Sequence, residues 1–509
     1  MTMGALDQSQ VVGVVGAGTM GAGIAEVAAT AGHPVCLFDN RKGAAGDAIA
    51  RIAARLERSV EKGRIDATER EGILSRMEPV DALEELAPCA LVVEAIVEDL
   101  GIKQDLFSTL EGILGNDAIL ATNTSSISIT AIGAALNNPG RLVGMHFFNP
   151  ATLMKLVEVV HGLASDPAVV DTVFATSEAW GKKSVKVSST PGFIVNRVAR
   201  PYYAEALRAL GEGATDVATI DAVMKECGGF RMGPFELMDL IGQDVNAAVS
   251  RTVFSALNHD TRFEPSLIQQ ELVAAGRLGR KAGRGFYDYT EGAALPAPAT
   301  AEPAAAPAEI TAYGDLGGVE PLQDSAERAG MTGERAAAEC PGPGWLRVGS
   351  ANLALSDGRS ATERTRQGLE NLVVMDLALD YSAATRIAVA PADQCDAEAL
   401  DAVVGLFQAL GKSVSVIDDY PGMLVLRTVC MLANIGTDAV HKGVCSAEAV
   451  DTAMRFGVNY PRGPLAWAES IGVTRVVDFL DHLAREYGED RYRVSPLLRR
   501  KVWGETGFF

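Results

Sequence analysis

Three glycines near the N-terminus, Gly16, Gly18 and Gly21, stand in the pattern G-x-G-x-x-G between two different hydrophobic periodicities. Residues 11–15 are mostly valine and predict a short buried strand, whereas the residues after the glycines follow a helical pattern. In such a turn the first glycine permits the bend, the second lets a pyrophosphate approach the backbone, and the third packs the helix onto the sheet. Free N–H groups at the helix start would hold the phosphate. The alternative is an ordinary strand–helix turn, but the context predicts a dinucleotide site in a doubly wound α/β sheet.

The residue that follows the next predicted strand, 35–38, is Asp39. At this place in a doubly wound sheet a carboxylate accepts hydrogen bonds from both hydroxyls of the nucleotide ribose. The same negative charge would repel the 2′-phosphate of NADP. The sequence therefore predicts NAD as the preferred cofactor.

A histidine and a glutamate are expected to meet in a hairpin. The apolar run 142–145 predicts a strand that ends at His146, Pro150 forces a turn, and residues 156–160 predict the returning strand with Glu158 in it. A carboxylate beside an imidazole fixes its tautomer and makes it a better proton acceptor. The alternative is a core histidine that only satisfies a loop carbonyl.

Two more polar sites stand out against apolar surroundings. A predicted strand at 118–122 runs into a cluster of Asn, Thr and Ser that includes Ser125. Such a cluster often only caps a helix, but the carboxyl ends of strands are where ligands bind in doubly wound sheets. Asn196 follows Pro191 in a predicted helical region, between apolar neighbours, where a buried amide needs a partner. A capping or surface role is the alternative for this amide.

Several segments together resemble the L-3-hydroxyacyl-CoA dehydrogenase family. The segment from His146 to Glu158 matches the H-F-F-N-P…L-V-E signature of that family nearly residue for residue. The run 191–197 is similar to its P-G-F-I-V-N-R motif, and the segments 233–242 and 279–287 are similar to its helical domain. These motifs cover residues 11–289 without a gap in the pattern.

The resemblance implies a role for each of these residues. His146 would abstract the proton of the 3-hydroxyl group while Glu158 holds and polarises the imidazole. Ser125 and Asn196 would bind the 3-oxygen and the thioester region. The cofactor contacts that the resemblance and the glycine pattern imply are Gly16, Gly18, Thr19, Met20, Gly21, Asp39, Ala95, Glu98, Lys103, Ser125, Asn149 and Lys281. The substrate contacts are Ser125, Asn149, Asn196 and, near the CoA nucleotide, Lys62.

The second half of the chain repeats the first at a constant spacing along the sequence. Pro191-Gly192 recurs as Pro421-Gly422, Gly233-Pro234 as Gly463-Pro464, and Gly181-Lys182 as Gly411-Lys412. An internal duplication accounts for this. The residues with chemistry have changed, because His146, Asn149, Glu158 and Asn196 become Asp376, Leu379, Ala388 and Leu426. The second half is therefore expected to be a structural copy.

The expected fold class is α/β, in five segments. A Rossmann-type NAD-binding domain (1–188) precedes a helical substrate and dimerisation-type domain (189–290), and an extended Ala/Pro linker follows (291–308). A truncated, degenerate α/β copy (309–418) and a second helical copy (419–509) complete the chain. The two helical copies are expected to pack together as a dimer within one chain, with a further homo-oligomer possible. The alternative is an independent lobe on a loose linker.

Composition limits the partners and the location. A formal net charge of −20, from 45 basic and 65 acidic residues, argues against nucleic acid and anionic membranes as partners. The N-terminus lacks a signal-peptide pattern and no apolar run reaches the length of a membrane span. The seven cysteines are scattered without C-x-x-C and are expected to be buried thiols, with no metal site. These features predict a cytoplasmic protein.

Together, the motifs and the resemblance predict an oxidoreductase, an NAD-dependent (S)-3-hydroxyacyl-CoA dehydrogenase of fatty acid metabolism. Its long form resembles bacterial members that act on 3-hydroxybutyryl-CoA or 3-hydroxyadipyl-CoA, the latter in aerobic phenylacetate degradation. The sequence does not choose between these acyl chains. Two alternatives remain, a different NAD-dependent hydroxyacid dehydrogenase, which would use a lysine as base, and a non-catalytic NAD-binding scaffold.

Overall fold

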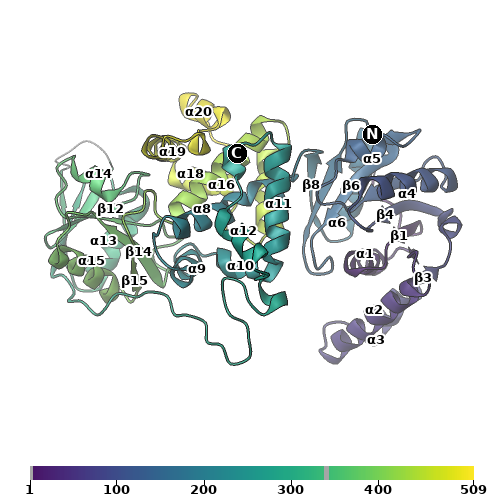
Figure 1. Ribbon diagram of the computed structural model, residues 1–509, viewed down its shortest axis with the longest axis horizontal. Coiled ribbons are helices and arrows are strands. Elements are labelled where there is room, and N and C mark those ends of the chain that lie inside the picture. Colours follow the sequence, from purple (N-terminus) through teal and green to yellow (C-terminus); the bar gives the residue numbers. More distant parts are fainter. Residues whose placement is uncertain (1–3, 338–342) are drawn as a thin grey trace. The chain divides into compact units, whose positions relative to one another are not determined.

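The computed structural model describes residues 4–337 and 343–509, and the chain forms two compact units (Figure 1). Unit 1 contains Met1–Arg197 together with Lys442–Val458, and unit 2 contains Val198–His441 together with Asn459–Phe509. A segment of the C-terminal part of the chain therefore belongs to the N-terminal unit.

Unit 1 is built around an eight-stranded sheet with the strand order β3-β2-β1-β4-β5-β6-β7-β8. Its strands are β1 (Val11–Val15), β2 (Val35–Phe38), β3 (Met77–Val80), β4 (Cys89–Glu94), β5 (Ile119–Thr122), β6 (Leu142–Phe147), β7 (Leu156–His161) and β8 (Lys183–Ser188). Neighbouring strands run parallel except β6 and β7, which form the predicted hairpin. The strands β5 and β6 are buried at every residue, and β1 and β4 at all but one, so these strands read as nearly continuous apolar runs in the sequence. The predicted doubly wound sheet is confirmed.

The helices of unit 1 connect these parallel strands. They are α1 (Thr19–Thr30), α2 (Ala44–Glu61), α3 (Ala67–Ser75), α4 (Leu100–Ile113), α5 (Ile129–Gly133) and α6 (Pro167–Ala179), and the short α7 (Val195–Val198) ends the first segment of the unit. A further helix, α17 (Ala447–Gly457), comes from the distant segment and packs on β7 and β8. Gly457 fits closely there, because a Cβ at this position would come within 2.5 Å of the Leu156 side chain.

Unit 2 combines helices with a second, seven-stranded sheet of order β10-β9-β11-β12-β13-β14-β15. Its strands are β9 (Glu309–Tyr313), β10 (Thr332–Ala336), β11 (Trp345–Val348), β12 (Ala351–Leu355), β13 (Leu372–Met375), β14 (Arg386–Pro391) and β15 (Ser413–Val416). The strands β11 and β12 form an antiparallel hairpin, so this sheet begins differently from the sheet of unit 1. The helices that join its strands are α13 (Glu320–Arg328), α14 (Ala361–Thr365) and α15 (Ala397–Ala409).

The helical part of unit 2 brings together segments from both halves of the sequence. Its helices are α8 (Arg200–Gly211), α9 (Val217–Glu226), α10 (Pro234–Ile241), α11 (Gln243–Ala256), α12 (Leu267–Ala274), α16 (Val425–His441), α18 (Pro464–Ile471), α19 (Val473–Tyr487) and α20 (Pro496–Trp503). Helix α8 packs along α16, and α9 packs on β14.

A buried charge network joins α8 to the second half of the chain. Glu205 is only 2% exposed, and its carboxylate lies 2.9 Å from Arg427 Nε and 2.9 Å from Arg491 Nη2. Burial raises the pKa of Glu205, but Arg491 and Arg427 outweigh this effect and lower it. Tyr492 also donates a hydrogen bond to this carboxylate. A buried carboxylate needs such partners, so the network makes α8 dependent on the C-terminal helices.

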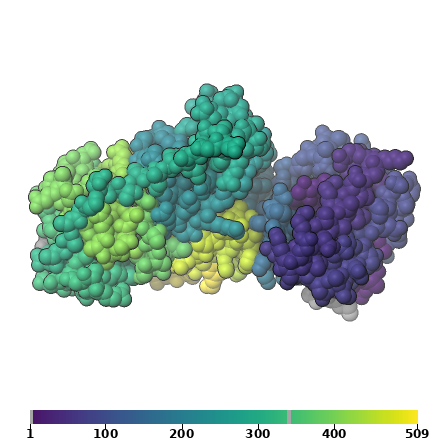
Figure 2. Space-filling view, turned by 90° about the horizontal axis from the view of Figure 1, so that it is seen from below, coloured from purple at the N-terminus to yellow at the C-terminus, as the bar shows by residue number. Residues whose placement is uncertain are grey.

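The linker, 291–308, contains no helix or strand and is hydrogen-bonded to unit 2. The backbone N–H of Ala299 donates to Thr219 Oγ1 on α9, and that of Ala301 donates to the carbonyl of Val414 in β15, both at 2.8 Å. The N–H of Ala304 donates to the side chain of Gln408 at 2.8 Å. The segment therefore lies along the surface of this unit (Figure 2).

The cysteines of the described residues are thiols, of which four are buried and two, Cys395 and Cys445, are only partly buried. The prediction of buried thiols is therefore wrong for these two, and Cys340 lies outside the described residues. Within 4–337 and 343–509, no helix is both long and apolar enough to cross a membrane.

Candidate active site

The glycine turn has the geometry that a dinucleotide needs. Gly16 has a φ of +106°, and a Cβ there would lie 2.5 Å from the carbonyl oxygen of Ala95. A Cβ on Gly21 would lie 1.7 Å from the carbonyl oxygen of Gly16, so both glycines are required for packing. Gly18, the residue before α1, is different, because a Cβ there would meet no atom within 4 Å. The open space beside Gly18 and the N–H groups of Thr19 and the following turn fit a pyrophosphate.

Asp39 is held beside this turn at the end of β2. Its Oδ2 accepts a hydrogen bond from the N–H of Ala17 at 2.8 Å, and its Oδ1 accepts from the N–H of Arg41 at 3.0 Å. Burial raises the pKa of Asp39, but the hydrogen bonds from Arg41 and Ala17 outweigh burial and lower it. The carboxylate is therefore charged and fixed in orientation, as a ribose acceptor requires.

Lys103 lies in a buried ion network rather than on the surface. Its side chain is 1% exposed, with Nζ 2.6 Å from Glu94 Oε1 and 3.4 Å from Glu98 Oε2. Thr122 at the end of β5 donates to the other oxygen of Glu94 at 2.7 Å. Sequence reasoning missed Glu94, although its position as the last residue of an apolar strand was a signal. The contact of Lys103 with the cofactor remains a prediction.

Glu98 in turn organises the loop that carries Ser125. Its Oε1 accepts hydrogen bonds from Thr124 Oγ1 at 2.5 Å and from the N–H groups of Ser125 and Ser126, both at 3.1 Å. Burial raises the pKa of Glu98, but the bonds from Thr124 and Ser126 and the charge of Lys103 lower it overall. The loop therefore depends on a carboxylate 27 residues earlier in the chain.

The hairpin of β6 and β7 places His146 directly opposite Glu158, as predicted. His146 Nδ1 lies 2.7 Å from Glu158 Oε2, and both side chains are buried. The other carboxylate oxygen, Oε1, accepts from the N–H groups of Ile194 at 2.9 Å and Val195 at 3.0 Å. A carboxylate on Nδ1 favours the tautomer in which Nε2 is the proton acceptor. The predicted pairing of these two residues is confirmed.

The same carboxylate fixes the segment that carries Asn196. Asn196 follows Val195 in α7 and is only partly exposed. Because Glu158 holds the backbone N–H of Val195, the histidine and the start of α7 share one anchor. The predicted roles of Asn196 and Ser125 toward a substrate remain predictions.

The loop between β6 and β7, which carries Asn149, is held by a lysine that sequence reasoning did not assign to the site. Lys182 Nζ donates to the carbonyl oxygens of Ala151 at 2.5 Å and Met154 at 3.0 Å. Burial lowers the pKa of Lys182 to about 8. The signal was present in the sequence, because Gly181-Lys182 is one of the pairs that recur in the second half. Asn149 itself is exposed, and its contact with the cofactor remains a prediction.

The two remaining predicted lysines lie in different units. Lys62 is an exposed residue at the end of α2 in unit 1. Lys281 belongs to unit 2, where its Nζ lies 2.6 Å from Asp244 Oδ1. Their contacts with CoA and with the cofactor remain predictions.

The position that corresponds to His146 in the second half carries a different function. Asp376 is buried and accepts hydrogen bonds from the N–H groups of Leu424 at 2.9 Å, Val425 at 2.7 Å and Leu426 at 2.9 Å. In the repeat these are the counterparts of the segment 194–196, which Glu158 anchors in the first half. Burial raises the pKa of Asp376 to about 6. One aspartate therefore keeps the backbone anchor, without an imidazole beside it.

Among the residues that the structure describes, no group of three or more His, Cys, Asp or Glu side chains is placed to hold a metal ion.

Comparison with known families matches most of the chain, residues 11–289 and 353–507 apart from residue 191. Residues 11–190 match the 3-hydroxyacyl-CoA dehydrogenase NAD binding domain. The C-terminal domain of the same family matches residues 192–289 and again residues 422–507. Residues 353–421 match the 3-hydroxybutyryl-CoA dehydrogenase reduced Rossmann-fold domain.

Individual relatives agree with this assignment. The chain is 44% identical over 499 residues to 3-hydroxyadipyl-CoA dehydrogenase of Escherichia coli K12, which covers 98% of each chain. It is 42% identical over 278 residues to a probable 3-hydroxybutyryl-CoA dehydrogenase of Bacillus subtilis, covering 55% of this chain and 96% of that relative. A crystal structure of 3-hydroxybutyryl-CoA dehydrogenase from Escherichia coli K12 superposes with a TM-score of 0.89 at 43% identity, covering 98% of this chain and 99% of that one. The chain belongs to the 3-hydroxyacyl-CoA dehydrogenase family.

Proposed function

We propose that this chain catalyses the reversible, NAD-dependent oxidation of the 3-hydroxyl group of an (S)-3-hydroxyacyl-CoA to the 3-keto thioester. The observation that supports the proposal most is the buried pair of His146 and Glu158, with Nδ1 and Oε2 2.7 Å apart. The pair lies at the carboxyl end of β6, in the same sheet as the glycine turn. In doubly wound sheets, this is the end at which ligands bind.

Proton transfer is the task that we assign to His146. With Nδ1 engaged by the carboxylate, Nε2 takes the proton of the 3-hydroxyl group, and the charge of Glu158 stabilises the imidazolium that forms. Hydride acceptance from the substrate carbon is the chemistry that NAD supplies when it is bound. General-base catalysis of this kind contributes roughly 10²–10⁴ to the rate. In the reverse direction the imidazolium returns the proton to the 3-oxygen.

The residues around the pair would position the two reactants. Ser125 and Asn196 bind the 3-oxygen and the thioester region, and Asn149 supports the nicotinamide side. Glu98 and Lys103 act by ordering the loop of Ser125, which is supported by the hydrogen bonds from that loop to Glu98.

The nucleotide side of the proposal rests on the glycine turn and on Asp39. Gly16 and Gly21 shape the turn, Gly18 leaves room for the pyrophosphate, and Ala95 lies against Gly16. The anchored carboxylate of Asp39 would accept from the ribose hydroxyls and select NAD over NADP. Two further contacts complete the proposal. Lys281 would contact the cofactor, and Lys62 would contact the CoA nucleotide.

The acyl chain is short or dicarboxylic in this proposal. The relatives named above are called 3-hydroxyadipyl-CoA and 3-hydroxybutyryl-CoA dehydrogenases. The sequence resemblance suggested that the enzyme takes part in aerobic phenylacetate breakdown. Whether it does so depends on which of these two thioesters it prefers.

We further propose that residues 309–509 are a degenerate second copy and that its helices imitate the partner of a dimer. Two observations support this. The same C-terminal domain matches 192–289 and 422–507. In addition, α9 packs on β14 while α17, its counterpart in the repeat, packs on β7, so each copy lends this helix to the other sheet. Short relatives would then need a second chain where this protein uses its own C-terminal part.

The oxidation of NADH with acetoacetyl-CoA, followed by absorbance, tests the activity directly. We expect turnover with NADH, and kcat/KM for 3-hydroxybutyryl, 3-hydroxyadipyl and long-chain thioesters then ranks the substrates. A purified, folded protein that neither oxidises NADH with acetoacetyl-CoA nor reduces NAD with any of these 3-hydroxyacyl thioesters would contradict the proposal.

A further inference from the structure

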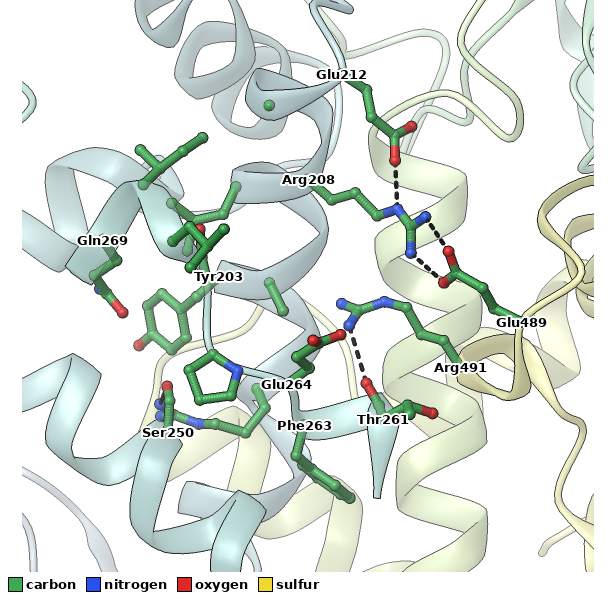
Figure 3. A pocket seen from close by; sticks show the side chains of 18 of the residues that line it. Tyr203, Arg208, Glu212, Ser250, Thr261, Phe263, Glu264, Gln269, Glu489 and Arg491 are labelled. Carbon is green, nitrogen blue, oxygen red and sulfur yellow. Dashed lines mark hydrogen bonds and ion pairs between the residues drawn. The ribbon is translucent and has the colours of Figure 1, made fainter. Parts of the chain in front are cut away.

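Unit 2 contains a cavity of about 840 Å³ that is lined by three arginines and by apolar and polar side chains (Figure 3). The cavity lies among α8, α11 and the segment that leads into α12, and residues 488–491 close one side of it. Its lining is mixed, with Leu207, Phe263 and Leu267 as apolar members and Arg200, Tyr203 and Ser250 as polar ones.

Arg200 differs from the other two arginines that line the cavity. Arg208 donates two hydrogen bonds to Glu489, at 2.7 and 2.9 Å, and Arg491 is bound to Glu205. Arg200 is only 6% exposed, yet no carboxylate contacts it within the described part of the chain.

The contacts of Arg200 are weak for a buried charge. Its Nη1 donates to Ser250 Oγ at 3.2 Å, its guanidinium lies 4.9 Å from the centre of the Tyr203 ring, and its Nε is buried without a hydrogen-bond partner. A buried guanidinium without an anion is costly, so its retention calls for an anion that the cavity admits.

The second half of the chain offers an internal comparison, which rests on the proposed repeat. The polar residues that line the cavity include Arg200, Tyr203, Asn246, Ser250 and Gln269. At the spacing that carries Pro191 to Pro421, the first four become Cys430, Ala433, Val476 and Leu480. Gln269, three residues after the cap of α12, corresponds to Leu498, three residues after the cap of α20.

All five counterparts are apolar or weakly polar and fully buried. The copy without the imidazole–carboxylate pair has therefore filled these positions with well-packed side chains. The first copy keeps polar groups around an open cavity at the same places, although apolar residues would stabilise it more.

We propose that this cavity binds the carboxylate end of an aliphatic diacid, with Arg200 as its counter-ion. Ser250 and Tyr203 would fix the guanidinium, and the apolar side chains of Leu207, Phe263 and Leu267 would cover the methylene groups. A guanidinium suits this task because it binds a carboxylate through two parallel N–H donors. The carboxylate has two possible sources, the far end of a dicarboxylic acyl-CoA substrate or a free dicarboxylate. In the first case the proposal rests on the dehydrogenase function above and names its substrate class.

The test uses the full-length protein and the variants Arg200→Met, Arg200→Lys and Arg208→Met. The last is a matched control, because Arg208 lines the same cavity but already has its carboxylate partners. Adipate binding is measured by calorimetry, with adipamide as the uncharged comparison. The ratio of kcat/KM for 3-hydroxyadipyl-CoA to that for 3-hydroxybutyryl-CoA is measured in parallel.

If the acyl chain is the source, Arg200→Met lowers this ratio at least tenfold, whereas Arg200→Lys retains part of it and Arg208→Met does not change it. If a free dicarboxylate is the source, the ratio stays constant, but wild type binds adipate and Arg200→Met does not. Either result supports the cavity as a carboxylate site. Melting of the ligand-free protein gives a second readout, because removal of an unpaired buried charge should raise the midpoint.

The proposal is overturned if Arg200→Met changes neither the ratio nor adipate binding, or if wild type shows no preference for adipyl over butyryl thioester and no adipate binding. A wild-type protein that turns over neither thioester contradicts the dehydrogenase function, and adipate binding then still reports on the cavity.

Discussion

Glu158 contacts His146 through one carboxylate oxygen and anchors a neighbouring backbone segment through the other. Oε2 lies 2.7 Å from the imidazole Nδ1, while Oε1 accepts from the N–H groups of Ile194 and Val195. A change at Glu158 must therefore affect both the tautomer of the histidine and the position of α7.

Replacing Glu158 with Gln is expected to lower kcat by roughly 10–10², the equivalent of one lost charged hydrogen bond of about 1.5–3 kcal/mol. The amide oxygen would satisfy the N–H groups of Ile194 and Val195, and the amide NH₂ would then face Nδ1 of His146. This arrangement favours the tautomer with its proton on Nε2, which cannot accept another. Steady-state kinetics with a separate measurement of NADH affinity checks the prediction. Unchanged kcat would show that the charge on Glu158 does not assist the histidine.

Replacing Asp39 with Ser is expected to raise KM for NADH and to shift the ratio of kcat/KM for NADPH over NADH upward at least tenfold, about 1.4 kcal/mol. The substitution removes the repulsion of a 2′-phosphate and leaves Arg41 to meet it. The double variant with Arg41→Ala is the control, because it should lose the gain with NADPH. Equal use of both cofactors by the wild-type protein would contradict the role of Asp39.

The pKa of Asp376 predicts a pH dependence of stability. Its pKa in the folded chain, about 6, is above its ordinary value of 3.8, so the folded chain binds the proton more tightly than the unfolded chain. The contribution of Asp376 to the free energy of unfolding is therefore fully present below pH 3.8. It decreases by up to about 3 kcal/mol as the pH rises to about 6. The free energy of unfolding of wild type minus that of Asp376→Asn should fall over this range. A difference that is constant, or that rises with pH, would contradict the prediction.

Cutting the chain after Tyr289 tests the proposed packing of the two copies. The truncated protein would retain the buried Glu205 without Arg427 and Arg491, and breaking a buried pair of this kind costs about 3–5 kcal/mol. It should aggregate or form a conventional dimer, as seen by sedimentation, with a lower melting midpoint. A Glu205→Gln variant of the truncated chain is the control, because it removes the stranded charge. A truncated chain that stays monomeric and as heat-stable as the whole would rule out the packing.

Local patterns predicted the parts of the site that lie close together in the sequence. The period of two in a strand and the turn at Pro150 are enough to place Glu158 opposite His146, because the two residues are only 12 positions apart. The glycine turn and Asp39 were predictable for the same reason, because each is a local feature: the first is one turn and the second is the residue at the end of one strand.

Contacts between distant segments were not predictable in this way. A lysine in a helix is normally expected on the surface. Lys103 is buried because the fold places Glu94 and Glu98 beside its ammonium group. Lys182 reaches carbonyl oxygens 28 and 31 residues away, which no periodicity encodes. The helix α17 packs on β7 and β8 although about 260 residues separate it from β8, and the spacing of the repeated motifs does not tell which sheet a helix covers.

The turnover of His146→Gln shows whether His146 is the proton acceptor. Gln keeps a polar side chain of similar reach but cannot act as a base, so kcat should fall by roughly 10²–10⁴ while the dissociation constant for NADH stays within about twofold. Single-turnover rates with NADH and acetoacetyl-CoA, together with NADH binding followed by fluorescence, give the two quantities on the same protein. We expect a large loss of turnover with intact NADH binding. Near wild-type turnover would show that the proton acceptor lies elsewhere and would contradict the mechanism.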